Sequence, residues 1–141
     1  MLIALLLTLA ALVAAVLIHY EALRLVSVAM PGMTIPPRRR LLVLIGAAFV
    51  AHVAEILVFT GVYLLLDNVL GLGALTGETE GGFWDHFYFS ASTYSTLGVG
   101  DVTPTGPLRV VAGLESLAGL VLITWSASFS YLAMREFWDL H

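Results

Sequence analysis

Cysteine and lysine are absent from this chain of 141 residues, and charged residues of all kinds make up only 11% of it. The lack of cysteine excludes disulfides, thiol nucleophiles and thiolate ligands for soft metals. Soluble globular domains carry about 25% charged residues, so the scarcity of charge excludes an ordinary soluble domain. With six basic residues in total, the chain also lacks the basic surface that a nucleic-acid partner requires, and we expect no such partner.

Long apolar stretches, in contrast, fill most of the chain. Residues 1–18 carry no charge and predict a helix that continues toward residue 30, whereas residues 41–66 and 108–134 carry two ionisable groups each. At about 1.5 Å per residue, each stretch is long enough to cross a hydrocarbon core of about 30 Å. We therefore predict three membrane spans. The alternative for the first stretch is a cleaved signal peptide, which its lack of a basic start and of a small-x-small cleavage site disfavours.

The arginines are unevenly distributed along the chain. Arg24 and residues 38–40 flank the first connection, Arg135 follows the last apolar stretch, and residues 67–85 contain four acidic residues and no basic one. Under the positive-inside rule, the arginine-rich connection and the C-terminus face the cytoplasm. We therefore expect a multi-pass protein of the plasma (inner) membrane with its N-terminus and the acidic connection outside.

Between the second and third apolar stretches lies a segment of another kind. Residues 83–94 (FWDHFYFSASTY) are aromatic-rich and too short to span about 30 Å, which is typical of a re-entrant half-helix. Residues 67–82 before them are glycine-rich and acidic and predict an exposed loop. The polar run after them, STYSTLGVGDVTP, would lie at membrane depth, where irregular backbone is tolerated only against protein or a water-filled cavity.

The glycines of this polar run suit a pore for a cation. A cation that leaves water exchanges its hydration shell for oxygen ligands, which rings of backbone carbonyls supply. Gly98 and Gly100 adopt positive φ at little cost, so that successive carbonyls can face one axis. Thr96 adds a hydroxyl at the inner mouth, Asp101 adds an acid at the outer mouth, and the C-terminal end of the half-helix contributes partial negative charge. The alternative is an ordinary loop containing a Gly-x-Gly-Asp turn.

The sequence YSTLGVGDVTP resembles the pore signature of the potassium-channel superfamily, T-x-G-[YF]-G-D, and residues 83–134 resemble its pore helix, filter and inner helix. The resemblance implies an all-α membrane protein with three transmembrane helices, a re-entrant pore helix (83–94) and a filter loop (96–101). It also implies a homotetramer in membrane lipid, with one filter per subunit around a four-fold axis. The outer helix would span about 41–66 and the inner helix about 108–134.

What the resemblance implies for function is passive conduction rather than enzymatic catalysis, with potassium as the permeant monovalent cation and no cofactor. It divides the chain into an extra helix and loop, residues 1–37, and a pore domain, residues 38–141. Asp101 becomes the outer-mouth acid. The ion-binding filter residues are Thr96, Leu97, Gly98, Val99 and Gly100.

The motif departs from the family pattern in two places. Val99 stands where the family has tyrosine or phenylalanine, so the ring that packs behind the filter is missing. A weakly selective monovalent-cation channel is therefore an alternative to a potassium channel, since the part that filter rigidity plays in selectivity is debated. Ser92 stands where several members have a carboxylate behind the filter. A second alternative is a non-conducting membrane scaffold or sensor that keeps the pore fold.

Two residues of the last apolar stretch are candidates for bracing or gating. Glu115 lies inside the predicted span, where an ionisable group is by default the basis for a functional hypothesis. It either lines the cavity or braces the pore helix through Ser92 or Thr93, and the bracing role is preferred. Gly119 stands where the family often places an inner-helix hinge, although a small residue also permits close helix packing, as does Gly113.

The second apolar stretch carries His52 and Glu55, which share one helix face at a spacing of three. They predict either a mutually satisfied polar pair between helices or a proton-coupled gating site. His19, together with Glu21 and Arg24, is most simply interfacial. A metal site at Asp85 and His86 has little support, because two candidate ligands alone do not make a recognisable set.

Overall fold

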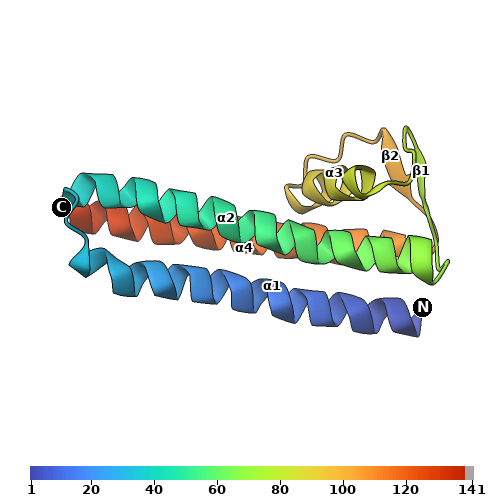
Figure 1. Ribbon diagram of the computed structural model, residues 1–141, viewed down its shortest axis with the longest axis horizontal. Helices are drawn as coiled ribbons and strands as arrows, with labels where there is room; N and C mark the ends of the chain where they lie inside the picture. The colour runs from blue at the N-terminus through green and yellow to red at the C-terminus, as the bar shows by residue number, and fades with distance from the viewer. Residues whose placement is uncertain (139–141) are drawn as a thin grey trace.

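The computed structural model describes residues 1–138 and is built around three long helices that run side by side (Figure 1). Its elements are, in chain order, α1 (Leu2–Ala29), α2 (Pro37–Leu64), β1 (Leu75–Gly77), α3 (Phe83–Tyr94), β2 (Val102–Pro104) and α4 (Leu108–Phe137). The three long helices are long and apolar enough to cross a membrane. The prediction of three membrane-crossing helices is therefore confirmed.

The ends of the long helices follow from proline and from local changes in helix type. A 3₁₀ turn, Met30–Gly32, ends the first helix at a proline-glycine pair. Helix α2 begins with Pro37, four residues before the expected residue 41, because the fixed φ of proline suits the first helical position. A π-helical turn, Leu65–Val69, prolongs α2, and α4 continues three residues past the expected residue 134.

Small and polar residues make up most of the packed face of the first helix, α1. They recur every three or four residues, which places them on one side of the helix. On α1 the buried residues are Ala4, Thr8, Ala11, Ala15, His19, Leu23 and Val26. Large side chains such as Leu6, Leu9 and Val13 are exposed. Because lipid is as apolar as leucine, membrane helices associate through small residues that permit close approach, and this pattern fits that mode of packing.

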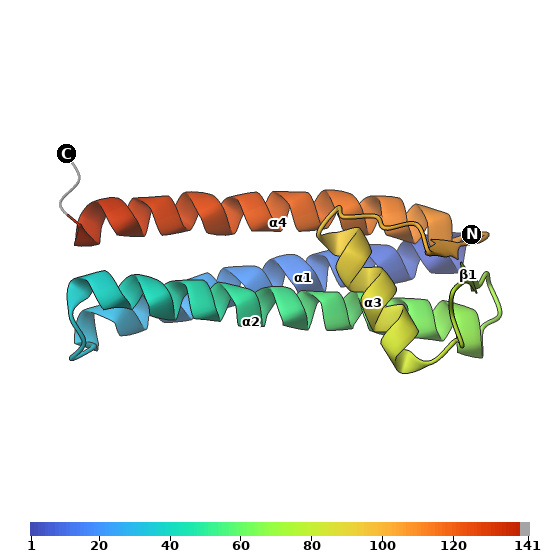
Figure 2. The same cartoon turned by 90° about the horizontal axis from the view of Figure 1, so that it is seen from above.

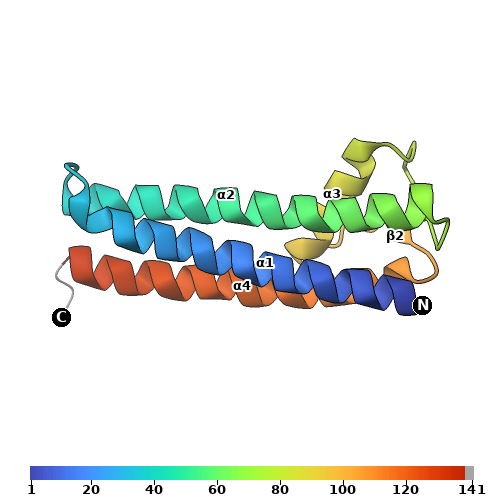
Figure 3. The same cartoon turned by 60° about the horizontal axis from the view of Figure 1, so that its bottom comes forward.

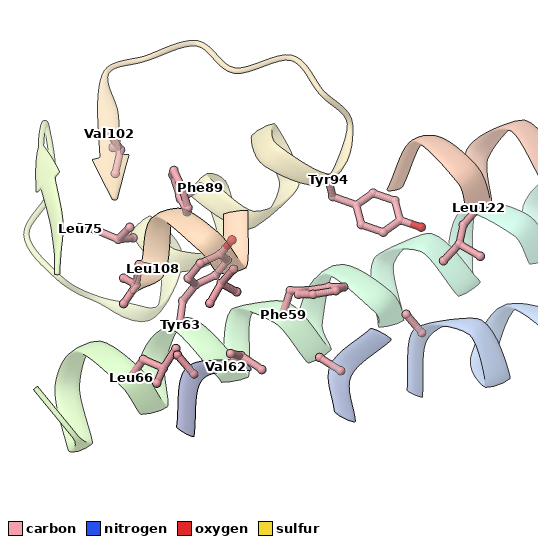
Figure 4. Packing of buried hydrophobic residues seen from close by; sticks show 14 residues of the cluster. Phe59, Val62, Tyr63, Leu66, Leu75, Phe89, Tyr94, Val102, Leu108 and Leu122 are labelled. Atoms are coloured by element: carbon pink, nitrogen blue, oxygen red, sulfur yellow. The ribbon is translucent and has the colours of Figure 1, made fainter. Parts of the chain in front are cut away.

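The first helix and the short helix α3 lie on opposite faces of the α2–α4 pair. Figure 2 shows α3 crossing both helices, and Figure 3 shows α1 lying along them from the other side. Figure 4 shows the core beneath α3, where the Tyr63 and Phe89 rings meet edge to face with centroids 5.1 Å apart. Tyr94 and Leu122 extend this core toward the middle of the bundle.

A two-stranded sheet lies at the end of the bundle beside α3 (Figure 1). Strand β1 pairs antiparallel with β2, so that Leu75 lies opposite Pro104 and Gly77 lies opposite Val102. The prediction of a plain exposed loop over residues 67–82 was therefore wrong in part. Short strands with a glycine at the end carry little alternating pattern, which is why sequence periodicity did not reveal them.

The start of α1 and the end of α4 lie at opposite ends of the bundle. The N-terminus of α1 lies at the same end as α3 and the strands, whereas the end of α4 is near the connection between α1 and α2, which Arg24 and residues 38–40 flank (Figure 1). A chain that crosses a membrane three times begins on one side and ends on the other, and these positions agree with that. The side of the membrane that faces the cytoplasm stays a prediction from the arginine distribution.

Candidate functional site: the loop between α3 and β2

The backbone angle φ alternates in sign along residues 96–100. Thr96, Gly98 and Gly100 have φ values of 61°, 57° and 88°, and Thr96 is the one non-glycine residue with positive φ among residues 1–138. Residues of alternating hand turn successive peptide groups to the same side of the chain. Glycine adopts a positive φ at little energetic cost, whereas at Thr96 the same conformation strains the backbone.

Ser92 determines to which side these peptide groups turn. Its carbonyl oxygen accepts hydrogen bonds from the amides of Leu97 and Gly98 at 2.9 and 3.2 Å, and its Oγ accepts one from the Val99 amide at 3.3 Å. In a planar trans peptide the N–H and C=O groups point in opposite directions. The carbonyls of residues 96–98 therefore point away from α3, out of the subunit.

The position before this loop is the C-terminal end of α3. Helix α3 ends at Tyr94, and the amide of Thr96 still donates to the Thr93 carbonyl at 3.0 Å. The partial negative charge at a helix C-terminus therefore lies next to the carbonyls of the loop, which favours a cation there.

The outer end of the loop is anchored at Asp101. The Tyr88 hydroxyl donates to Asp101 Oδ2 at 2.9 Å, and this bond raises the pKa of Tyr88. The amides of Val102 and Glu78 donate to Asp101 Oδ1 and to its backbone oxygen at 3.0 and 2.9 Å. A Cβ at Gly77 would lie 2.1 Å from that backbone oxygen, so only glycine allows β1 to approach this closely.

A hollow of about 380 Å³ lies between the loop and the helices α3 and α4. Its lining includes Val99, Tyr88, Ser92 and Ala112. The Val99 side chain borders this space, is 55% exposed in the single subunit, and has no ring to extend into it. The missing ring at position 99, noted from the sequence, thus corresponds to unfilled volume behind the loop.

Glu115 connects the three elements that surround the loop. Its carboxylate is fully buried and accepts hydrogen bonds from the Tyr63 hydroxyl of α2 and the Ser90 hydroxyl of α3, both at 2.5 Å. The expected partners on α3 were Ser92 and Thr93. The partner is Ser90 because Ser90 faces the helix pair, where its hydroxyl also lies 3.0 Å from the Ile56 carbonyl.

Gly119 lies where α4 passes under the end of α3. A Cβ at this position would lie 1.9 Å from the backbone oxygen of Tyr94, whereas a Cβ at Gly113 would have no neighbour within 4 Å. Close packing therefore accounts for Gly119, and its role as a hinge stays a prediction.

His52 and Glu55 are hydrogen-bonded at 3.1 Å, as their spacing suggests, but they belong to a larger buried cluster. The Nδ1 atom of His19 lies 3.0 Å from Glu55 Oε1, and the Tyr94 hydroxyl donates to the other carboxylate oxygen. The interfacial interpretation of His19 was wrong: it is fully buried, because a helix of this length places residue 19 against the middle of α2. Ser126 completes the cluster from α4.

Ligand atoms of His19, His52 and Glu55 lie within 4.8 Å of one another, a spacing that a metal ion could use. Each of these atoms already has a hydrogen-bond partner in the cluster, which is therefore complete without an ion. At the start of α3, His86 bonds to Asp67 at 3.1 Å and to the Gly82 carbonyl at 2.8 Å.

Asp85 caps α3 and orders the loop before it. Its Oδ2 accepts hydrogen bonds from the amides of Glu80 and Gly82 at 2.9 and 3.3 Å. The bond from the Glu80 amide is the main reason that the pKa of Asp85 lies below its usual range. Asp85 and His86 thus have separate structural roles in the loop.

The fold defines the class of protein. Helices α2 and α4 are long enough to span a membrane, and between them lie a short helix and a loop whose carbonyls point out of the subunit. This is an all-α membrane channel. A family model described as "Ion channel" matches residues 41–136, more than half of the chain. The chain belongs to this ion channel family. It is a channel rather than an enzyme, and it is a multi-pass membrane protein.

A second comparison concerns an individual relative. Over 83 residues the chain is 34% identical to the inward rectifier potassium channel Kirbac3.1 of Paramagnetospirillum magnetotacticum. The alignment covers 54% of this chain and 28% of the relative, so the chain spans little more than a quarter of that protein. No solved structure matches the chain. The resemblance to the pore module of the potassium-channel superfamily, drawn from residues 83–134, is confirmed by the first two comparisons.

Proposed function

We propose that four copies of this chain form a potassium channel that conducts passively through rings of backbone carbonyls from residues 96–100. The observation that carries the proposal is the direction of the peptide groups. The amides of residues 97–99 point back to Ser92, and the carbonyls before them therefore point out of the subunit. Because one subunit supplies only one set of carbonyls, a cation needs further copies to complete its shell.

The exposed side chains of the loop support an assembly as well. Leu97 is 71% exposed in the single subunit although it lies beside α3 at the predicted membrane depth. Neighbouring subunits would cover such surface. In such an assembly α1 would lie on the outside, because it packs on the face of the α2–α4 pair opposite α3 (Figures 2 and 3). Residues 1–37 would then be an accessory segment and residues 38–141 the pore domain.

The choice of potassium rests on the motif and on the relative, which is named a potassium channel. A weakly selective pore for monovalent cations is the alternative that Val99 favours, since position 99 itself contributes no ring to the hollow of about 380 Å³ behind the loop. Both versions use the same carbonyls, with Thr96 at the inner mouth and Asp101 at the outer mouth.

Flux from liposomes tests the proposal. The full-length protein is reconstituted into vesicles loaded with potassium or with sodium, and efflux is followed with an ion-sensitive dye. We expect potassium efflux at least tenfold faster than sodium efflux. Equal rates would indicate the weakly selective pore, and no efflux of either ion from vesicles containing verified tetramers would indicate a non-conducting scaffold. Crosslinking in the same membranes checks the number of subunits.

A further inference from the structure

Helix α1 lies outside residues 41–136, the part of the chain that the ion channel family model matches. It packs on the face of the α2–α4 pair opposite α3 (Figures 2 and 3). A connection between α1 and the carbonyl loop that follows α3 must therefore pass through α2 or α4. One hydrogen-bonded connection of this kind runs through a buried carboxylate of α2, Glu55.

The two carboxylate oxygens of Glu55 bond to different helices. Oε1 lies 3.0 Å from the Nδ1 atom of His19 on α1. Oε2 accepts a hydrogen bond from the hydroxyl of Tyr94, the last residue of α3, and lies 3.1 Å from His52 Nδ1. Glu55 and His19 are fully buried, and Tyr94 is nearly so. Glu55 therefore links α1 to the end of α3 in the interior of the subunit.

His19 is the donor in its bond to Glu55. An ionised carboxylate only accepts hydrogen bonds, so the Nδ1 atom of His19 carries the hydrogen. The other ring nitrogen, Nε2, faces Ser126 Oγ of α4 at 3.2 Å. The Trp125 ring packs on the imidazole with centroids 5.1 Å apart. Contacts from α4 thus hold the imidazole in one orientation, with its Nδ1–H directed at Glu55.

Without His19 the carboxylate cannot keep all of its contacts. Among residues 1–138, His19 is the one hydrogen-bond partner of Glu55 Oε1, whereas Tyr94 and His52 both lie at Oε2. A buried acceptor that loses its donor is unfavourable, and more so when it is charged. The carboxylate regains a donor for Oε1 by rotating toward Tyr94 and His52, and this rotation takes Oε2 away from the Tyr94 hydroxyl.

Tyr94 is the residue through which such a change reaches the loop. It is followed after one residue by Thr96, where the carbonyl loop begins. Figure 4 shows its ring pointing from the end of α3 toward Leu122 of α4. Among residues 1–138, the partners of its hydroxyl are Glu55 and His52 Nδ1, the latter 2.9 Å away. A shift of Glu55 therefore loosens the side chain that anchors the start of the loop.

We propose that His19 is a positioning residue for the ion path. By holding Glu55 it holds Tyr94, and with Tyr94 the end of α3 at which the carbonyl loop begins. Helix α1 is then coupled to the carbonyls of residues 96–98, although it packs on the far side of α2 and α4. The effect on ion flux rests on the proposed function, whereas the effect on the order of the loop does not.

Three replacements of His19 separate its bond to Glu55 from its contact with Ser126. The side-chain nitrogen of asparagine lies close to the place of Nδ1 and that of glutamine close to the place of Nε2, whereas phenylalanine keeps a ring without polar atoms. We expect His19→Asn, which keeps a donor to Glu55, to resemble the wild type, and His19→Gln to resemble His19→Phe. The reverse order would show that the contact with Ser126 is the one that matters, and it would overturn the proposal.

Hydrogen exchange of the full-length protein in lipid nanodiscs, followed by mass spectrometry, needs no conduction. The amides of residues 97–99 bond to Ser92, so their exchange reports how firmly the loop is held. We expect peptides covering residues 95–101 to exchange about tenfold faster in His19→Phe than in the wild type. The start of α3, where His86 bonds to Asp67 at 3.1 Å, should exchange as before. Equal acceleration over the whole chain, or none in the loop, would contradict the proposal.

The liposome assay adds the functional readout. We expect the ratio of potassium to sodium flux to fall about 2- to 30-fold in His19→Phe. Thr8→Val is the control: Thr8 is also fully buried on α1, and its hydroxyl bonds only to the Ala4 carbonyl of its own helix at 2.6 Å. A wild type that does not conduct would end the proposed function and leave the exchange test intact. A conducting wild type with an unchanged ratio in His19→Phe would overturn the positioning role.

A double-mutant cycle of His19→Phe with Tyr94→Phe tests the path through Glu55. Tyr94→Phe removes the hydroxyl that receives the effect of His19. In that background, His19→Phe should therefore add little to the exchange rate of residues 95–101. Additive effects of the two changes would show that His19 acts on the loop by another route, and they would refute the connection through Glu55.

Discussion

The carbonyl oxygen of Tyr94 occupies the space in which a side chain on Gly119 would begin. A Cβ at residue 119 would lie 1.9 Å from that oxygen and 2.7 Å from the carbonyl carbon. Tyr94 is the last residue of α3 and immediately precedes the loop whose carbonyls we assign to the ion path. The close contact between Gly119 and Tyr94 therefore determines how near the loop lies to α4.

Replacing Gly119 with alanine should push α3 away from α4. The atom that a new Cβ would meet belongs to the backbone and cannot rotate aside. We therefore expect the variant to be destabilised by about 1–3 kcal/mol or more, and to lose potassium flux. Gly113→Ala is the matched control: it has open space around it, and alanine improves helix propensity by up to about 1 kcal/mol. Thermal unfolding in detergent compares the two variants. A Gly119→Ala protein as stable and active as Gly113→Ala would contradict the close contact.

Replacing Val99 with tyrosine should sharpen selectivity for potassium. The ring would enter the hollow of about 380 Å³ behind the loop and restrict the movement of its carbonyls. We expect the ratio of potassium to sodium flux to rise about tenfold in the liposome assay. Val99→Leu adds bulk without a ring and is the control. An unchanged ratio in Val99→Tyr would show that ring packing is not what controls selectivity here.

The hydrogen bonds of Glu115 should stabilise the packing of α3. Glu115→Ala leaves the buried Tyr63 hydroxyl without its acceptor, at a cost of about 1–3 kcal/mol, whereas Glu115→Gln keeps an acceptor oxygen and should cost less. A double-mutant cycle with Tyr63→Phe measures the bond itself. Because the double variant leaves no unpaired hydroxyl at this site, its destabilisation should be smaller than the sum of the single changes. Strict additivity would contradict the bond.

Asp85 should stabilise the folded protein only while it is ionised. Its pKa is below the usual value of 3.8 because the Glu80 amide donates to the carboxylate. A lowered pKa in the folded state means that the stabilisation is present above pH 3.8 and is lost as the pH falls through the folded value. The unfolding midpoints of the wild type and Asp85→Ala should therefore differ at pH 6 and approach each other as the pH falls below 3.8. A gap that stays constant with pH would indicate a role for packing alone.

The arrangement of the chain along the membrane could be predicted because it depends on properties of consecutive residues. Apolar length predicts the three crossings, and the short aromatic segment predicts α3 with the bounds Phe83–Tyr94 that the structure has. The alternation of Gly98 and Gly100 predicts positive φ at both positions, and both have it. The pairing of His52 with Glu55 follows from their spacing of three, because neighbours on a helix face are determined by the helix itself.

Contacts between helices depend on rotation and on crossing position, which one sequence does not specify. The partner of Glu115 on α3 is Ser90 rather than Ser92 or Thr93, since the rotation of α3 turns Ser92 toward the loop. His19 is buried for the same kind of reason: α1 lies along α2 and α4 at a depth that brings residue 19 against Glu55. The sequence by itself thus determined the crossings and the carbonyl loop. Tertiary packing decided which polar groups meet, because hydrogen bonds between helices need a register that no single helix contains.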